Sequence, residues 1–267
     1  MKIQDFRRAK EEGRKLSMVT AYDYTMARIV NASAVDCVLV GDSAAMVMHG
    51  HPSTLQATTE LMRLHTRAVA RGAPDKFVVA DMPFLSFRKG LAPAMDCVQA
   101  LMQAGACAVK LEGLIGHEAT LEHIIRSDVP VMGHLGLTPQ SVHKLGGYRV
   151  QGRDSASARA LKEQAARLEE LGCFALVLEC VPEELAGEVS AELSIPVIGI
   201  GSGRRTDGQV LVLQDLLGMT HDLAPKFVKR YLEGCSLMKD ALDRFDAEIK
   251  NGGFPEDPAK HHRVAKA

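Results

Sequence analysis

The chain has 267 residues, of which 46% are hydrophobic and 24% are charged, and its formal net charge is -1. This composition argues against a disordered chain, and 32 Lys and Arg against 33 Asp and Glu leave no basic excess for binding nucleic acid. No run of residues is long and apolar enough for a membrane span, and the charged N-terminus carries no secretory signal. We therefore expect a cytoplasmic enzyme or binding domain without a membrane partner.

Short apolar runs alternate along the chain with longer amphipathic segments. Seven of these runs are typical of buried strands: SMVTAY (17–22), VDCVLV (35–40), KFVVAD (76–81), CAVKLE (107–112), PVMGH (130–134), FALVLE (174–179) and IPVIGIG (195–201). A weaker run near the C-terminus, PKFVKRY (225–231), is the candidate for an eighth strand. Because the strands are continuously apolar rather than alternating, they favour a parallel sheet covered by helices.

The segments between the strands have helical spacing. Apolar residues predict a helix within 54–72 that ends at Gly72, with its buried face formed by Leu61, Leu64, Ala68 and Val69. Segment 92–105 predicts a second helix with Ala94, Val98, Leu101 and Met102 on one face. Further helices are expected in 116–128, 154–172 and 182–194. Asp154 has the position of an N-cap, and Gly172 has the position of a C-cap.

This alternation predicts a (β/α)₈ TIM barrel. An open doubly wound sheet is the alternative, but its dinucleotide-binding fingerprint is missing after the first strand. No Pro-, Gly- or Ser-rich linker divides the chain, so we predict one barrel domain over residues 1–267, with a C-terminal tail from about residue 252. The polar, Gly-rich segment 138–153 is expected to form an extended loop over the barrel mouth.

The six cysteines show no CxxC pairing, and several of them lie within apolar runs. We expect them to be small buried hydrophobic residues in a reducing compartment rather than disulfides or zinc ligands. They are Cys37, Cys97, Cys107, Cys173, Cys180 and Cys235.

Polar side chains stand where several of the predicted strands end. In a (β/α)₈ barrel the active site is built at the C-terminal ends of the strands, so these side chains are expected to meet in one mouth. The candidates are Asp42, Ser43, Asp81, Lys110, Glu112, His134 and Glu179. His134 fits either a satisfied core histidine or a contact to substrate.

Several carboxylates around one lysine require a physical reason. Two like charges about 4 Å apart repel by roughly 4 kcal/mol at an effective dielectric constant near 20. Some of these acids therefore hold protons, or a cation lies among them. Oxygen ligands favour a hard divalent ion such as Mg²⁺ over zinc, and an α-keto acid offers two further oxygens in chelating geometry.

Other motifs carry weaker signals. His49 and His51 are interpreted as part of a polar loop, and His261 and His262 as part of the tail. The pair at 221–222, His-Asp, lacks the companion histidines of a metal phosphohydrolase. The glycine-rich 199–203 lacks the GK[ST] ending of a P-loop, so we expect a tight turn that lets backbone approach a ligand.

Many motifs resemble one family in the same order over nearly the whole chain. They are TAYDYTMAR, VLVGDS, HTRAV, ADMPF, VKLEG, VMGHLGLTPQS, KLGGY, LVLECVP, PVIGIGSG, TDGQVLVLQDLLG and PKFVKRY. The chain resembles the ketopantoate hydroxymethyltransferases. This resemblance implies a barrel of the phosphoenolpyruvate mutase/isocitrate lyase type, one Mg²⁺ per subunit, and a homo-oligomer, with a decamer as the first guess. It also implies transfer of a hydroxymethyl group from 5,10-methylenetetrahydrofolate to 3-methyl-2-oxobutanoate, giving 2-dehydropantoate for pantothenate synthesis.

The resemblance also implies roles for the polar residues at the strand ends. The residues that match the metal-binding carboxylates are Asp42, Asp81 and Glu112. The residues that match the keto acid contacts are Asp42, Ser43, Asp81 and Lys110. Glu179 matches the proton acceptor.

The chain departs from the family pattern after Ser43, where Leu-Gly-Met is replaced by Ala44, Ala45 and Met46. Ala45 would alter the loop if its backbone needs a positive φ or a close approach to a ligand. Two other hypotheses remain open. One is a Mg²⁺-dependent lyase or mutase, although the KKCGH-like loop of those enzymes is absent. The other is a catalytically silent barrel that binds or assembles, which would be free to lose one of the polar residues.

Overall fold

The computed structural model describes residues 1–220 and 225–256. The histidines predicted to lie in the tail, His261 and His262, and the 221–222 pair lie outside these residues. The elements are α1 (Ile3–Glu11), β1 (Leu16–Thr20), α2 (Tyr24–Ala32), β2 (Cys37–Val40), α3 (Ala44–Val47), η1 (Thr54–Gln56), α4 (Thr59–Gly72), β3 (Phe77–Asp81), α5 (Leu91–Gln103), β4 (Ala108–Glu112), α6 (Glu118–Arg126), β5 (Val131–Gly136), η2 (Pro139–Ser141), α7 (Val142–Leu145), α8 (Ser155–Leu171), β6 (Ala175–Glu179), α9 (Glu183–Glu192), β7 (Val197–Ile200), β8 (Gly208–Leu211), α10 (Leu213–Leu216) and α11 (Gly234–Asn251). None of the helices within the described ranges has the length and hydropathy needed to cross a membrane.

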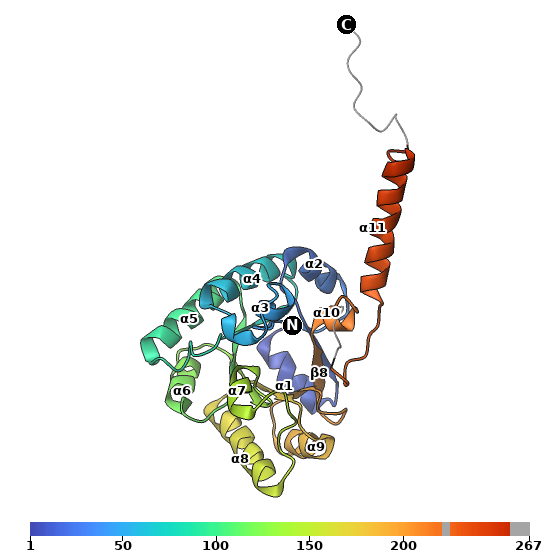
Figure 1. Ribbon diagram of the computed structural model, residues 1–267. Helices are drawn as coiled ribbons and strands as arrows, with labels where there is room; N and C mark the ends of the chain where they lie inside the picture. The colour runs from blue at the N-terminus through green and yellow to red at the C-terminus, as the bar shows by residue number, and fades with distance from the viewer. Residues whose placement is uncertain (221–224, 257–267) are drawn as a thin grey trace. The chain divides into compact units, whose positions relative to one another are not determined.

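The chain divides into two units, Met1–Leu213 and Gln214–Ala267. In the first unit, eight parallel strands form a closed barrel in the order β1 to β8, and β8 pairs with both β7 and β1. Helices α2, α4, α5, α6, α8 and α9 follow successive strands and surround the barrel (Figure 1). The predicted (β/α)₈ barrel is therefore confirmed.

The second unit contains the long helix α11, which ends at Asn251 with Gly252 in a left-handed C-cap conformation. The tail predicted from about residue 252 stays a prediction. The single domain over 1–267 stays a prediction.

The eighth strand was predicted in the wrong segment. Residues 225–231 form turns and irregular structure, whereas β8 is the four-residue segment Gly208–Leu211. The charged side chains of Lys226, Lys229 and Arg230 suit a strand buried on both faces poorly. Gly208 is required because a Cβ there would lie 2.5 Å from the carbonyl oxygen of Leu16 on β1.

One further prediction, the buried face of α4, differs in detail. On α4 the buried stripe contains Met62, Thr66 and Val69, and Leu64 is 51% exposed, so the predicted face was wrong at that position. The helix begins at Thr59 because the Thr58 side chain accepts a hydrogen bond from the N–H of Leu61.

The cysteines and the caps of α8 were predicted with mixed success. Cys37, Cys97 and Cys173 are buried as expected, but Cys107 is exposed. On α8, Asp154 caps the N-terminus by accepting from two backbone N–H groups, and Gly172 ends the helix with a φ of 103°. Both caps agree with the prediction.

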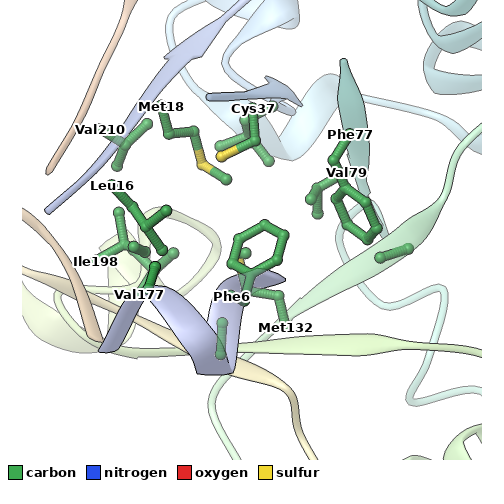
Figure 2. Close-up of a cluster of buried hydrophobic side chains, with 14 residues drawn as sticks. Phe6, Leu16, Met18, Cys37, Phe77, Val79, Met132, Val177, Ile198 and Val210 are labelled. Atoms are coloured by element: carbon green, nitrogen blue, oxygen red, sulfur yellow. The ribbon is translucent and has the colours of Figure 1, made fainter. Parts of the chain in front are cut away.

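The N-terminal end of the barrel is filled with apolar side chains. Figure 2 shows Phe6 of α1 among residues from the strands, including Phe77, Val79 and Met132. The ring of Phe6 lies 5.1 Å from that of Phe77 and 5.0 Å from that of Phe174, both edge to face. Such aromatic contacts add to the stabilisation from buried area. Helix α1 therefore closes this end of the barrel.

We predict that Phe6→Ala lowers the free energy of unfolding by about 3 kcal/mol or more, because it opens a cavity among buried rings. Urea unfolding followed by circular dichroism measures the change. Leu64→Ala, on the exposed side of α4, is the matched control and should change stability by less than about 0.5 kcal/mol. Equal losses in the two variants would contradict the packing role of α1.

Candidate active site

The charged residues continue the same inward-facing rows that form the apolar core. Side chains on a strand alternate between its two faces, so residues two apart point the same way. On β3 the core residues Phe77 and Val79 are followed on that face by Asp81. On β6, Ala175 and Val177 are followed by Glu179. The barrel interior is thus apolar at the starts of the strands and charged at their ends.

Strands β4 and β5 follow the same rule. Ala108 lies in the apolar core, and Lys110 and Glu112 are the next inward positions of β4. On β5, His134 follows Met132 and pairs in register with Glu112. Lys110 pairs in register with Asp81 on β3. Parallel register therefore places acids, a lysine and a histidine side by side.

All seven predicted side chains line one small cavity of about 110 Å³, at the C-terminal ends of the strands. Five of these residues are no more than 4% exposed: Asp42, Asp81, Lys110, Glu112 and His134. Ser43 and Glu179 are partly buried. The burial decides the electrostatics of the site, because charges removed from water interact strongly and are costly to leave unpaired.

Lys110 is the cation at the centre of this cluster. Its Nζ lies 2.9 Å from Asp81 Oδ1 and 3.1 Å from His134 Nδ1. Burial acts to lower the pKa of Lys110, but the surrounding carboxylates of Asp81, Glu112 and Asp42 outweigh it and raise that pKa above its ordinary value. Lys110 is therefore an ammonium ion at neutral pH.

The position of Lys110 decides the tautomer of His134. An ammonium group can only donate, so His134 Nδ1 accepts and the proton of the neutral ring lies on Nε2. That nitrogen is 3.2 Å from Glu179 Oε2. Burial, together with the nearby charge of Lys110, holds the pKa of His134 well below its ordinary value. His134 is therefore a neutral imidazole whose Nε2 lies near Glu179 without a hydrogen bond to it.

The pKa values of three carboxylic acids in the cluster are raised, whereas that of His134 is lowered. Burial raises the pKa of Asp42 to about 7, and the neighbouring charge of Asp81 adds to the shift. Burial and Asp42 raise the pKa of Glu112 above its ordinary value. Burial raises the pKa of Glu179 to about 7, against an opposing effect of Lys110. Near neutral pH Asp42 and Glu179 can accept or release protons.

Gln140 belongs to the site, and the sequence prediction missed it. Its side-chain Nε2 donates to Asp42 Oδ2 at 2.8 Å and to the carbonyl oxygen of Met82 at 3.0 Å. Its backbone N–H donates to Glu112 Oε2 at 2.9 Å. One residue of the segment predicted to cover the mouth therefore holds two carboxylates from different strands. A neutral amide in a polar loop carries no sequence signal beyond its position after β5.

Tyr22 was also missed, and it positions Ser43. The Tyr22 hydroxyl lies 2.8 Å from Ser43 Oγ, and its ring is buried. Directly after Ser43, Ala44 and Ala45 begin helix α3, and both are fully buried. Among the described residues, positive φ occurs outside glycine only at Leu85, Asp128 and Cys180. The replacement of glycine by Ala45 is therefore accommodated without backbone strain.

The carboxylates fit a hard divalent cation in donor type. Asp42, Asp81 and Glu112 offer oxygen atoms at the ends of neighbouring strands. Burial and mutual repulsion raise the pKa values of Asp42 and Glu112. Within residues 1–220 and 225–256, no three side chains of His, Cys, Asp and Glu are placed to ligate one ion. Asp42 Oδ2 is bonded to Gln140, and Asp81 Oδ1 is paired with Lys110. Asp42, Asp81 and Glu112 as metal ligands remain a proposal.

Two other predicted features have separate places in the structure. His49 and His51 lie exposed after α3, as expected for a polar loop. In the 199–203 turn, Gly201 and Gly203 have positive φ. Ser202 Oγ accepts from the N–H of Val181 and donates to the carbonyl oxygen of Leu178. These two hydrogen bonds link the 199–203 turn to the end of β6.

The sequence profile described as ketopantoate hydroxymethyltransferase matches residues 1–257. The chain belongs to the ketopantoate hydroxymethyltransferase family. A Coxiella burnetii protein is 54% identical to this chain over 256 residues, which cover 96% of each chain. A Bdellovibrio bacteriovorus protein is 54% identical over 255 residues, which cover 96% of this chain and 97% of the relative. Both are described as 3-methyl-2-oxobutanoate hydroxymethyltransferase. The family prediction is confirmed, and the chain is an enzyme of the hydroxymethyltransferase class.

Solved structures support the barrel type. A 2,3-dimethylmalate lyase, described as a PEP mutase/isocitrate lyase superfamily member, superposes with a TM-score of 0.61 at 15% identity, covering 97% of this chain and 91% of the lyase. A phosphonopyruvate hydrolase in complex with oxalate and Mg²⁺ has a TM-score of 0.63 at 12% identity, covering 99% and 93% of the two chains. At these identities the likeness shows the fold, which agrees with the predicted barrel type.

We predict that the cation-free protein loses stability as the pH rises from 5 to 7.5. Asp42 and Glu179 titrate near 4 when unfolded but near 7 when folded, so their stabilising protons are lost across this window. Urea unfolding in EDTA should show a fall on the order of 5 kcal/mol, because each of the two acids loses roughly two pKa units of stabilisation across this window, at about 1.4 kcal/mol per unit.

Asp42→Asn is the control for this pH dependence, because it removes one acid and one source of repulsion. Its unfolding free energy should fall less steeply over the same range. A wild-type stability that is flat or rises with pH in EDTA would contradict the shifted pKa values.

Proposed function

We propose that the enzyme transfers a hydroxymethyl group from 5,10-methylenetetrahydrofolate to 3-methyl-2-oxobutanoate, giving 2-dehydropantoate for pantothenate biosynthesis. One observation carries this proposal: Lys110, Glu179 and three further acids meet around a single buried cavity. That convergence suits a small anionic substrate from which a proton must be removed. The names of the relatives at 54% identity support the choice of substrate.

Asp42, Asp81 and Glu112 are the residues that would hold Mg²⁺. When bound, this ion supplies a Lewis acid that polarises the keto oxygen of the substrate, which is worth several kcal/mol. Lys110 contributes a fixed positive charge beside the same oxygens, where negative charge develops as the proton leaves. Ser43, held by the Tyr22 hydroxyl, is placed to hydrogen-bond the substrate.

Glu179 is the proposed base that removes the proton from C3 of the keto acid. A base is most effective when its pKa lies near the working pH, and burial brings the pKa of Glu179 to about 7. His134 Nε2 lies 3.2 Å from its Oε2 but makes no hydrogen bond to it. We therefore assign His134 to positioning Lys110, through the contact at Nδ1, as well as lining the substrate cavity. A positioned base contributes about 10² to 10⁴-fold.

The carbon of the resulting enolate forms a bond to the one-carbon unit carried by the folate. Overall, one water is consumed, tetrahydrofolate is released, and the product gains a hydroxymethyl group. The buried side chains that line the small cavity orient the enolate. We further propose that the enzyme acts in the cytoplasm on small molecules, as a homo-oligomer with a decamer as the first stoichiometry to test by light scattering.

We predict that Glu179→Gln keeps binding of 3-methyl-2-oxobutanoate but loses exchange of the C3 proton by at least about 10²-fold, because the amide cannot accept that proton. Proton NMR in D₂O with Mg²⁺ measures the exchange. Glu183→Gln on α9 is the matched control and should exchange at the wild-type rate. Undiminished exchange in Glu179→Gln would remove this residue from the role of base.

We also predict that EDTA abolishes product formation from 3-methyl-2-oxobutanoate and 5,10-methylenetetrahydrofolate, and that added Mg²⁺ restores it. The metal-free carboxylates repel one another and leave the keto oxygen unpolarised, so both binding and chemistry should fail. A coupled assay for 2-dehydropantoate measures the product. If no product forms with Mg²⁺ present, the proposed function is wrong.

A further inference from the structure

A second cavity of about 570 Å³ adjoins the catalytic one. It lies between the segments that follow β3, β4 and β5, and its lining includes Phe84, Ile115 and Lys144 from those three segments. Glu112 lines both cavities. Gln140 also lines the second cavity and is bonded to Glu112. The wall between the two spaces is therefore made by site residues.

The second cavity is much larger than the small keto acid requires. The keto acid is accounted for by the 110 Å³ space that holds Lys110 and Glu179. A volume of about 570 Å³ is in the range of pockets that take drug-sized ligands. The larger space therefore suits a second, bigger molecule that reacts next to Glu112.

The lining has an apolar and aromatic part. It includes Leu55, Phe84, Phe87 and Leu114. Phe84 is 38% exposed, so part of this residue is accessible to a ligand. Such a wall suits a flat heteroaromatic ring, since stacked aromatic rings attract beyond their buried area.

The ionisable part of the lining is mainly basic. Arg88, His143 and Lys144 line the cavity, and Glu112 is the single carboxylate among the lining residues that the structure describes. Arg88 Nη1 donates to the carbonyl oxygen of Ile115 at 3.0 Å, which uses one of the five N–H donors of a guanidinium. Lys144 is exposed on the short helix α7. The cavity thus has its acid beside the catalytic site, Arg88 near that acid, and Lys144 on α7.

The geometry points to this cavity as the binding site of the one-carbon donor, with the heteroaromatic ring against Phe84 next to Glu112 and an anionic tail on Lys144 and Arg88. This inference rests on the proposed function. The shared residue Glu112 brings the donor's reactive carbon beside the keto acid cavity. The basic side chains complement the glutamyl carboxylates that the tail of a folate carries.

The test compares two probes on the Mg²⁺-loaded enzyme by titration calorimetry. Tetrahydrofolate carries both the ring and the anionic tail, whereas 6-methyltetrahydropterin carries the ring alone. Lys144→Glu should weaken tetrahydrofolate binding about tenfold and leave 6-methyltetrahydropterin binding unchanged, because charge reversal acts on the tail. Phe84→Ala should weaken both probes about fivefold, because it removes the stacking surface.

Arg71→Glu, on the outer helix α4, is the control for the change of charge and should bind both probes like the wild type. Each variant is also tested for C3 proton exchange, which needs no donor, to show that the fold and the keto acid site are intact. Unchanged tetrahydrofolate binding in Lys144→Glu and Phe84→Ala overturns the inference. Equal weakening of both probes by Lys144→Glu overturns the placement of the tail. Absence of C3 exchange in the wild type instead refutes the proposed function.

Discussion

The site depends on the burial of several acids around one ammonium group inside a closed barrel. Lys110 compensates Asp81 directly, at 2.9 Å, and accounts for only part of the negative charge around it. The remaining acids are left with raised pKa values, since burial disfavours their ionised forms. The interior is thus prepared to take up a cation or protons. The same burial brings the pKa of Glu179 to about 7, which suits the role of base that we propose for it.

The barrel makes this arrangement possible because one of its ends is apolar and stabilises the fold, whereas the other carries the charged side chains of the site. At the starts of the strands, Phe6 and the residues around it pack as a dry core. Two residues further along the same inward rows, the side chains become charged. The stable end of the barrel holds the strands in register, and the register in turn fixes which charged groups are neighbours, as with Asp81 and Lys110. Strong packing at one end offsets the electrostatic cost at the other.

Much of the fold and of the candidate site could be predicted from the sequence, for a physical reason. Asp42, Asp81, Lys110, Glu112 and Glu179 follow apolar runs, and parallel strands that close into a barrel bring such ends together. The segment of β8 could not be recognised because it has four residues, begins with glycine and contains a glutamine, so it has neither the length nor the hydrophobicity of the other strands. Tyr22 and Gln140 were missed because their roles arise from three-dimensional contacts across segments distant in sequence.

Gln140 ties the loop after β5 to the charge state of the barrel mouth. Its backbone N–H binds the carboxylate of Glu112 and its side chain binds that of Asp42, so the conformation of this loop and the arrangement of the two acids form one equilibrium. Couplings between binding events are reciprocal. An ion that draws these acids together therefore acts on the loop, and a molecule that rests against the loop alters the affinity for the ion. Order of substrate addition is thus a property that this single amide can set.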